Sequence, residues 1–378
     1  MRLLQEVRFK IMWRQVLWVA LVWTIFGFLD ALNTEAMSNT ALLQATERYQ
    51  FQPFLLLNTF IWFISGFASG FALIFYLRES GRSKYFGYAF LRNSIVLTLI
   101  HFSIHGIVFQ LIRQTNTTNL GDQSVVYKTL QWLGSPYYTK SLVMGYIIAA
   151  LTIVALHVND KFGPGMLRKI LLGNYYQPVQ EERIFLFVDM KSSTTIAEKM
   201  GHLRFHSLLN DFFRDITNPI LYTSGEVLQY VGDEVVISWT MKKGIHKANC
   251  VRCFYEMQTI IHKQSEKYND KYGLVPEFKG GLHCGTVTAG EIGVIKKDVV
   301  FSGDVVNTTS RIQSLCNEYN VNLLLSKYLL DKLHLPPSDF YPKRMGMIEL
   351  KGKRQKVELY TFEESEKNQL FHPILELG

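Results

Sequence analysis

The chain has 378 residues and a formal net charge of +8 at pH 7. Hydrophobic residues make up 48% of it and its mean hydropathy is slightly positive, which argues against a purely soluble protein and predicts membrane-spanning segments. Much of the basic excess lies beside apolar runs, so the charge favours a lipid bilayer rather than nucleic acid as a partner.

Four apolar runs occupy the first 160 residues, and we expect each to form a transmembrane helix, at about 12–32, 53–77, 94–112 and 141–158. Basic residues predominate before the first run and between the second and third, whereas the first loop holds Glu35, Glu47 and only Arg48. This asymmetry places the N-terminus in the cytoplasm, and an even number of spans returns the chain there. The sequence therefore predicts a multi-pass protein of the cell (inner) membrane, with residues 1–158 as its membrane domain.

Two histidines, His101 and His105, lie four residues apart in the third run and so share one helix face. Ionisable groups inside a membrane are often functional, so a metal, haem or proton role is one hypothesis. Hydrogen bonding between helices is the alternative. A transport function is disfavoured, because the four runs contain few charged groups.

Residues 159–182 are expected to form a coupling linker, with Gly163, Pro164 and Gly165 as a joint. From Arg183 onward, strand and helix patterns alternate, which predicts a mixed α/β domain over 183–364, followed by a C-terminal tail at 365–378. Strands are expected at 184–188, 227–230, 235–239, 278–284, 299–301, 321–325 and 357–362, and helices at 195–224, 243–268, 304–318 and 326–333. In the second helix, Cys250 and Cys253 have CxxC spacing but no second pair, so we expect buried thiols rather than a zinc site.

Two carboxylates mark the ends of predicted strands. Asp189 directly follows the apolar strand in "FLFVDMKSST", and Asp233 lies in the Gly-Asp turn of "YVGDEVV". Two carboxylates plus substrate phosphates are a usual ligand set for Mg²⁺, and two metals can assist phosphoryl transfer. The small residues Ser193 and Thr194 would leave backbone N–H groups free for phosphate oxygens. The alternative is that Asp189 caps the helix that begins near Ser193.

Four further polar residues accompany glycine-containing motifs. Lys279 lies in a strand beside glycines, where it could contact a base or a phosphate or simply be a surface lysine. Asn307 and Arg311 share one face of a helix, and arginine suits the charge on a transferring phosphate; a solvated helix face is the alternative. Lys351 lies in a glycine turn, where a turn charge pair is the simpler explanation.

The order of these motifs is more specific than any one of them. F-x-D-x-x-S-S-T, G-D-E, F-K-x-G-x-x-x-G, G-D-x-V-N-x-x-x-R and L-K-G-K follow one another over about residues 181–364. This series resembles the catalytic domain of membrane-anchored, bacterial-type class III adenylyl cyclases. The resemblance implies an α+β domain with a ferredoxin-like βαββαβ core and an added hairpin. It also implies conversion of ATP to 3′,5′-cyclic AMP and pyrophosphate, in a head-to-tail homodimer with two shared active sites.

The resemblance assigns a role to each matching residue. Two Mg²⁺ or Mn²⁺ ions would be held by Asp189, Asp233 and the backbone carbonyl of Met190. Asn307 would orient the ribose, and Arg311 would stabilise charge in the transition state.

The remaining assignments concern the phosphates and the base. Lys351 would bind the terminal phosphates, beside Ser193 and Thr194, and Lys279 would select adenine. The usual partner of that lysine is Asp, Thr or Ser, but here the position holds Val300. Asp298, Ser302 or a backbone carbonyl would have to replace it, so discrimination between ATP and GTP could be loose.

Three other functions are considered as alternatives to an adenylyl cyclase, and the sequence disfavours each of them. A guanylyl cyclase is disfavoured by Lys279, and a catalytically silent receptor or dimerisation module by the complete set of motif residues. A diguanylate cyclase is disfavoured because its GG(D/E)EF signature is absent.

Overall fold

The computed structural model describes residues 2–38, 51–77, 86–114, 134–163, 173–335, 340–349 and 356–362. The predicted site residue Lys351 and the linker residues Pro164 and Gly165 lie outside these ranges. The chain separates into two compact units, one spanning Phe9–Lys161 and the other containing the chain from Phe162 onward.

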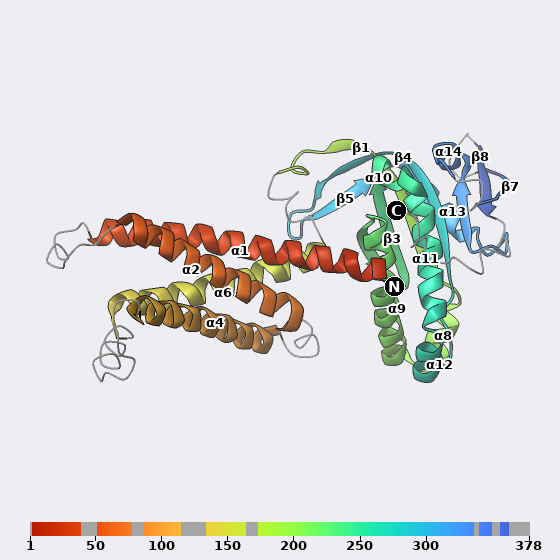
Figure 1. The fold of residues 1–378 in the computed structure, drawn as a ribbon. Coiled ribbons are helices and arrows are strands. Elements are labelled where there is room, and N and C mark those ends of the chain that lie inside the picture. Colours follow the sequence, from red (N-terminus) through yellow and green to blue (C-terminus); the bar gives the residue numbers. More distant parts are fainter. Residues whose placement is uncertain are drawn as a thin grey trace. The chain divides into compact units, whose positions relative to one another are not determined.

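The first unit is built from long helices: α1 (Arg2–Ser38), α2 (Phe51–Ala72) with a π-helical turn at Leu73–Leu77, α4 (Phe86–Gln114) and α6 (Pro136–Phe162) (Figure 1). Four segments in the described part of the chain are long and apolar enough to cross a membrane, Phe9–Ala36, Gln52–Leu77, Phe86–Val108 and Tyr138–Lys161. The four predicted helices are therefore confirmed. The third begins at Phe86 rather than at the predicted residue 94, because the preceding eight residues are also helical.

Aromatic packing fills the interior of this unit. Trp23 and Trp62 are fully buried, and a Cβ atom at Gly27 would lie only 2.4 Å from Cβ of Trp62, so this glycine lets α1 and α2 approach closely. The buried His101 and His105 place their Nε2 atoms 3.4 and 3.3 Å from Oγ of Ser141 on α6. The two histidines thus form contacts between helices, as the second of the two sequence-based hypotheses expects.

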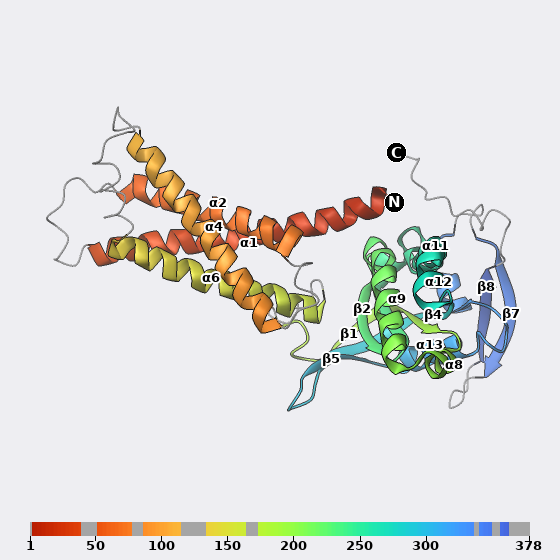
Figure 2. The same cartoon turned by 90° about the horizontal axis from the view of Figure 1, so that it is seen from below.

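Eight strands of the described residues form one sheet in the second unit: β1 (Val179–Met190), β2 (Glu226–Val231), β3 (Glu234–Thr240), β4 (Phe278–Ile292), β5 (Asp298–Ser302), β6 (Leu323–Ser326), β7 (Pro342–Glu349) and β8 (Lys356–Phe362). Their order is β2-β3-β1-β4-β6-β8-β7, and β5 pairs with β4. The four strands β2-β3-β1-β4 are antiparallel to their neighbours, with helices between β1 and β2 and between β3 and β4. This is the predicted βαββαβ core, and the hairpin of β4 and β5 extends beyond it (Figure 2).

Helices cover the two faces of this sheet unequally. The helices are α8 (Ser193–Met200), α9 (His202–Tyr222), α10 (Met241–Ile245), α11 (Asn249–Lys263), α12 (Ser265–Tyr272), α13 (Asp304–Ser314) and α14 (Lys327–Leu330). α9 and α11 lie side by side and share a core with Leu186 and Val188 of β1 (Figure 1). Phe185 and Phe187 point to the opposite face, where they pack against Val305 of α13. Alternation along β1 therefore decides which residues lie on the α13 face.

Some predicted elements differ from the observed ones. The predicted helix at 195–224 is interrupted at Gly201, which has φ of 81° and separates α8 from α9. β7 was not predicted, because most of its residues are exposed and its pattern is only weakly alternating. Cys250 and Cys253 are buried free thiols in α11, as expected, and burial raises the pKa of Cys250 to about 12.

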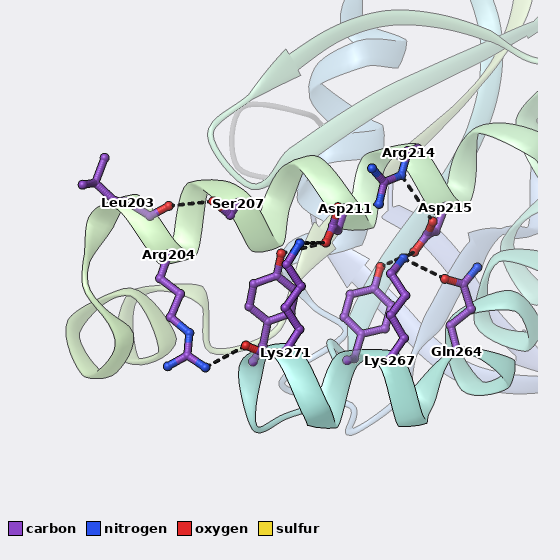
Figure 3. Close-up of polar contacts among 11 residues, drawn as sticks. Leu203, Arg204, Ser207, Asp211, Arg214, Asp215, Gln264, Lys267 and Lys271 are labelled. Atoms are coloured by element: carbon purple, nitrogen blue, oxygen red, sulfur yellow. Dashed lines mark hydrogen bonds and ion pairs between the residues drawn. The ribbon is translucent and has the colours of Figure 1, made fainter. Parts of the chain in front are cut away.

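A repeated polar contact holds α12 against α9 (Figure 3). Asp211 and Asp215, one turn apart on α9, each accept hydrogen bonds from one lysine and one tyrosine of α12: Lys271 and Tyr272 for Asp211, and Lys267 and Tyr268 for Asp215. The carboxylate of Asp211 is nearly buried, with 6% of its side chain exposed. Burial by itself would raise the pKa of Asp211, but the hydrogen bonds it accepts outweigh burial and lower it.

Candidate active site

Three acidic residues meet at one end of the sheet. In the strand register, Asp189 near the end of β1 lies opposite Glu234 of β3 on one side and Lys279 of β4 on the other. Asp233 lies beside them in the two-residue turn between β2 and β3. Gly232 begins this turn with φ of 63°, a conformation that glycine adopts without strain. The turn and the register together bring both predicted metal-binding aspartates to one place.

The side chain of Asp189 lies on the α13 face of the sheet, because it alternates with Phe185 and Phe187. Its Oδ2 atom is 3.4 Å from Nζ of Lys279 and accepts a hydrogen bond of 3.1 Å from Nε2 of Gln313. Lys279 and Gln313 are themselves buried, with 8% and 5% of their surface exposed. The carboxylate is thus held by one cation from β4 and one amide from α13.

Negative charge is concentrated at this end of the sheet. Burial raises the pKa of Asp189, and the neighbouring Asp233 raises it further, whereas Lys279 acts to lower it. The pKa of Glu234 is raised to about 7, first by burial and then by the two aspartates. Three carboxyl groups that lie together beside Lys279 favour the binding of a further cation.

The chemistry of these groups fits a divalent metal that arrives with phosphates. Within the residues that the structure describes, no group of three or more His, Cys, Asp or Glu side chains is arranged to hold a metal by itself. Mg²⁺ typically takes one or two carboxylates from a protein and completes its shell with water and substrate phosphates. Asp189 and Asp233 match that requirement, and the buried Met190 follows Asp189 directly in β1.

Two residues separate the end of β1 from the start of α8. Ser193 and Thr194 open this helix, and Ser192 before them is left-handed (φ of 56°) and makes no side-chain capping bond. The side chain of Asp189 contacts Lys279, Gln313 and Asp233, and among the described residues no hydrogen bond joins it to the start of α8, so the structure does not support the alternative in which Asp189 caps this helix.

α13 presents different residues on its two sides. Gln313 and Ile312 are buried against the sheet, whereas Asn307 and Arg311 are exposed. At about 100° per residue, Gln313 lies about 200° around the helix from Arg311. Asn307 and Arg311 therefore point away from the face of α13 that contacts Asp189 in the same chain. The structure places Asp189 beside Asp233, and it places Asn307 and Arg311 on one exposed side of α13. Within one chain, these two pairs of residues do not face each other.

The expected pairing of Lys279 with Val300 is wrong. Val300 in β5 lies opposite Gly290 of β4, which is 290 − 279 = 11 residues along the strand from Lys279. At about 3.3 Å per residue the separation is about 36 Å, far too long for both residues of one chain to contact a single base. Asp298, considered as a substitute partner, forms an ion pair of 2.7 Å with Lys296.

Two residues of this cluster were not identified from the sequence. Glu234 was visible in the G-D-E motif, but its position opposite Asp189 depends on the register of β1 with β3. Gln313 follows the motif arginine by two residues, on the other side of the helix, and no local pattern indicates that it reaches β1.

The comparison with known families defines the class of the second unit. The family model for the adenylate and guanylate cyclase catalytic domain matches residues 175–364. The chain belongs to this family, which confirms the resemblance to class III cyclases drawn from the motifs.

Individual relatives are similar over the same part of the chain. "Adenylate cyclase 2" of Rhizobium meliloti (strain 1021) is 37% identical over 216 residues, which are 57% of this chain and 59% of that protein. The "Adenylate cyclase" of Anabaena cylindrica is 24% identical over 184 residues, 46% of this chain and 35% of the relative. The chain thus spans less than two thirds of the length of either. A bacterial light-regulated adenylyl cyclase of solved structure shares the fold, with a TM-score of 0.50 and 23% identity over 58% of this chain and 65% of the other.

Proposed function

We propose that this chain is a membrane-anchored adenylyl cyclase that converts ATP to 3′,5′-cyclic AMP and pyrophosphate. The observation that carries the proposal is the opposite orientation of the two half-sites: Asp189 lies on the sheet, and Asn307 with Arg311 lies on the outer side of α13. A complete site then needs two copies of the chain, one supplying the aspartates and the other supplying Asn307 and Arg311. The names of the Rhizobium and Anabaena relatives support ATP as the substrate.

The carboxylates of Asp189 and Asp233 and the backbone carbonyl of Met190 would hold two Mg²⁺ or Mn²⁺ ions. When bound, these ions would act as Lewis acids toward the ribose hydroxyl and the phosphates. The guanidinium of Arg311 would donate hydrogen bonds to the phosphate oxygens on which charge develops. The amide of Asn307 would hold the ribose so that its 3′-oxygen lies in line with the α-phosphorus.

The start of α8 suits the triphosphate. Backbone N–H groups in the first helical turn, beside Ser193 and Thr194, would donate to phosphate oxygens at the positive end of the helix dipole. Lys351 stays a predicted ligand of the terminal phosphates.

We assign Lys279 a different role from the one its motif suggested. Its ammonium group lies 3.4 Å from Asp189 in the same chain, so it would balance charge in the metal half of the site rather than contact the base. The preference for ATP then loses its sequence-based support, and the apolar Val300 offers no side-chain hydrogen bond to a purine. Guanylyl cyclase activity is therefore the second candidate function.

The four apolar helices suggest a protein embedded in a membrane. We propose residues 1–158 as a membrane domain, 159–182 as a coupling linker and 183–364 as a cytoplasmic catalytic domain, with the N-terminus also in the cytoplasm. In this arrangement the membrane domain controls activity by setting how two catalytic domains meet.

A product assay tests the proposal directly. The full chain in lipid nanodiscs is supplied with Mn²⁺ and either ATP or GTP, and the cyclic nucleotide is measured. We expect cyclic AMP from ATP at a higher kcat/KM than cyclic GMP from GTP. The reverse preference would establish the second candidate, and no product from either nucleotide would refute cyclase activity.

The shared site is tested by complementation. Asp189→Ala and Asn307→Ala chains should each be inactive as homodimers, and co-expression should restore activity because a heterodimer rebuilds one intact site. Inactive mixtures in which heterodimers are shown to form would rule out the shared site.

A further inference from the structure

The side chain of Gln313 joins α13 to the carboxylate near the end of β1. Its Nε2 donates to Oδ2 of Asp189 over 3.1 Å, and Lys279 contacts the same oxygen at 3.4 Å. Neither of these contacts falls on Oδ1. Together they hold Oδ2 of this carboxylate in place beside the neighbouring Asp233.

The backbone of α13 lies directly on β4. A Cβ atom at Gly281 would be 2.4 Å from the backbone nitrogen of Gln313, and one at Gly285 would be 2.6 Å from Cγ2 of Val305. Val305 and Gln313 are eight residues apart, about 12 Å along a helix, and the two glycines are four residues apart, about 13 Å along a strand. The helix therefore runs along β4 in close contact with it near both ends, and a small change in its position is felt along its whole length.

The outer side of the same helix carries Asn307 and Arg311, about 240° and 200° around the axis from Gln313. Under the proposed function these two residues serve the active site whose aspartates come from the other chain. α13 is then the one described element that contacts the metal half of one site and supplies the transition-state residues of the other.

We propose that Gln313 is a positioning residue that couples the two active sites of the dimer. Its hydrogen bond to Asp189 fixes the position of α13 relative to β1. In that position, Asn307 and Arg311 on the same helix contact the substrate of the other site. A change at Asp189, such as the arrival of metal and nucleotide, is transmitted through this bond to the opposite face of the helix. The inference rests on the proposed shared site, and coupling between two binding sites typically changes affinity by about 5–150-fold.

The first test measures metal binding without turnover. Gln313→Met removes the donor and keeps the length and the apolar stem of the side chain, so the buried position stays filled. Titration of the full-length homodimer with Mn²⁺, in the presence of a non-cyclisable ATP analogue, is followed by the EPR signal of free Mn²⁺. We expect the midpoint of binding to rise about tenfold. Thr309→Val is the control, since Thr309 is equally buried on α13 but bonds only the carbonyl of Val305, and its midpoint should stay within twofold of wild type.

The second test measures transmission to the other site. In each heterodimer one chain carries Asn307→Ala and keeps its aspartates, and its partner supplies Asn307 and Arg311 but lacks a working metal site. That partner carries either Asp233→Ala, which leaves the contact between Gln313 and Asp189 in place, or Asp189→Ala, which removes it.

Adding Gln313→Met to the partner chain then separates coupling from packing. On the Asp233→Ala background, Gln313→Met should lower kcat about tenfold with little change in KM, because it removes the hydrogen bond from Gln313 to Asp189. On the Asp189→Ala background it should change kcat less than twofold, because the contact is already absent.

Equal losses on both backgrounds would show that Gln313 acts only by filling space, and no loss on either would show that the contact is not transmitted; both results overturn the coupling. An unchanged Mn²⁺ midpoint in the homodimer overturns the positioning role. If the parent heterodimers are inactive, the shared site itself fails, and the Mn²⁺ titration still decides the role of Gln313.

Discussion

Replacing Gly281 with alanine should displace α13 and slow catalysis without unfolding the domain. The added Cβ would lie 2.4 Å from the backbone nitrogen of Gln313 and 2.7 Å from its Cα, whereas ordinary contacts begin at 3.4 Å. Relief of the overlap therefore requires a shift of about 3.4 − 2.4 = 1.0 Å, and the atoms that must move belong to the helix backbone rather than to a flexible side chain.

Such a shift acts on both half-sites. It lengthens the 3.1 Å hydrogen bond from Gln313 to Asp189, and it carries Asn307 and Arg311 out of position for the other site. A misplacement of about 1 Å can lower the rate on the order of a hundredfold. The extra methyl group should lower the free energy of unfolding by about 1–3 kcal/mol, as at other overpacked positions, so the domain should stay folded.

The neighbouring glycine provides a matched control. A Cβ at Gly280 points to the opposite face of the sheet and meets the side chain of Phe254 at 2.7 Å, which can shift without moving α13. Gly280→Ala should therefore cost similar stability but leave kcat within about threefold of wild type. Both variants are compared by cyclic AMP formation at saturating ATP and Mn²⁺ and by thermal unfolding of the full chain.

Together the two variants separate the effect of the position of α13 from the effect of general destabilisation. A Gly281→Ala enzyme that keeps its kcat within about threefold would show that α13 tolerates a 1 Å displacement. A Gly280→Ala enzyme that loses as much activity as Gly281→Ala would show that the loss reflects general destabilisation rather than the position of the helix.

Three further outcomes are expected. Asp233→Ala should lower the rate of cyclic AMP formation far more than tenfold in a folded protein, because it removes a metal ligand, and a smaller loss would contradict the two-metal assignment. Asp211→Asn should lower the free energy of unfolding at pH 7 by about 1–3 kcal/mol, measured by chemical denaturation. Because the folded-state pKa of Asp211 is lowered, its carboxylate stabilises the fold above the unfolded-state pKa, and this contribution is lost as the pH falls through the folded-state value. The variant should therefore lose less stability than wild type on acidification below pH 4, and identical pH profiles would refute this. Inserting one alanine after Phe162 lengthens α6 by one residue, which turns the end of this helix by about 100°, and should change kcat more than KM; an unchanged kcat for one to four inserted alanines would indicate a passive tether.

Local pattern was sufficient for much of this protein. The apolar runs predicted the four long helices that the structure describes in the first unit, because the length and hydropathy of a spanning segment are properties of the segment alone. The order of motifs predicted the family and the βαββαβ core. Asp189 and Asp233 could be proposed as neighbours because each ends a strand or occupies a turn, and strand ends gather at the edges of a sheet.

What the sequence left open depended on register and on packing between distant segments. The family resemblance matched Lys279 and Val300 to one base, yet Val300 in β5 pairs with Gly290, which lies 11 residues along β4 from Lys279. Gln313 and Asp189 are 124 residues apart in the chain, and their contact exists only because Gly281 admits the backbone of α13. Strand periodicity tells which residues share a face, but only the folded sheet determines which helix covers that face. This helix places the proposed catalytic residues Asn307 and Arg311 on the side that points away from Asp189.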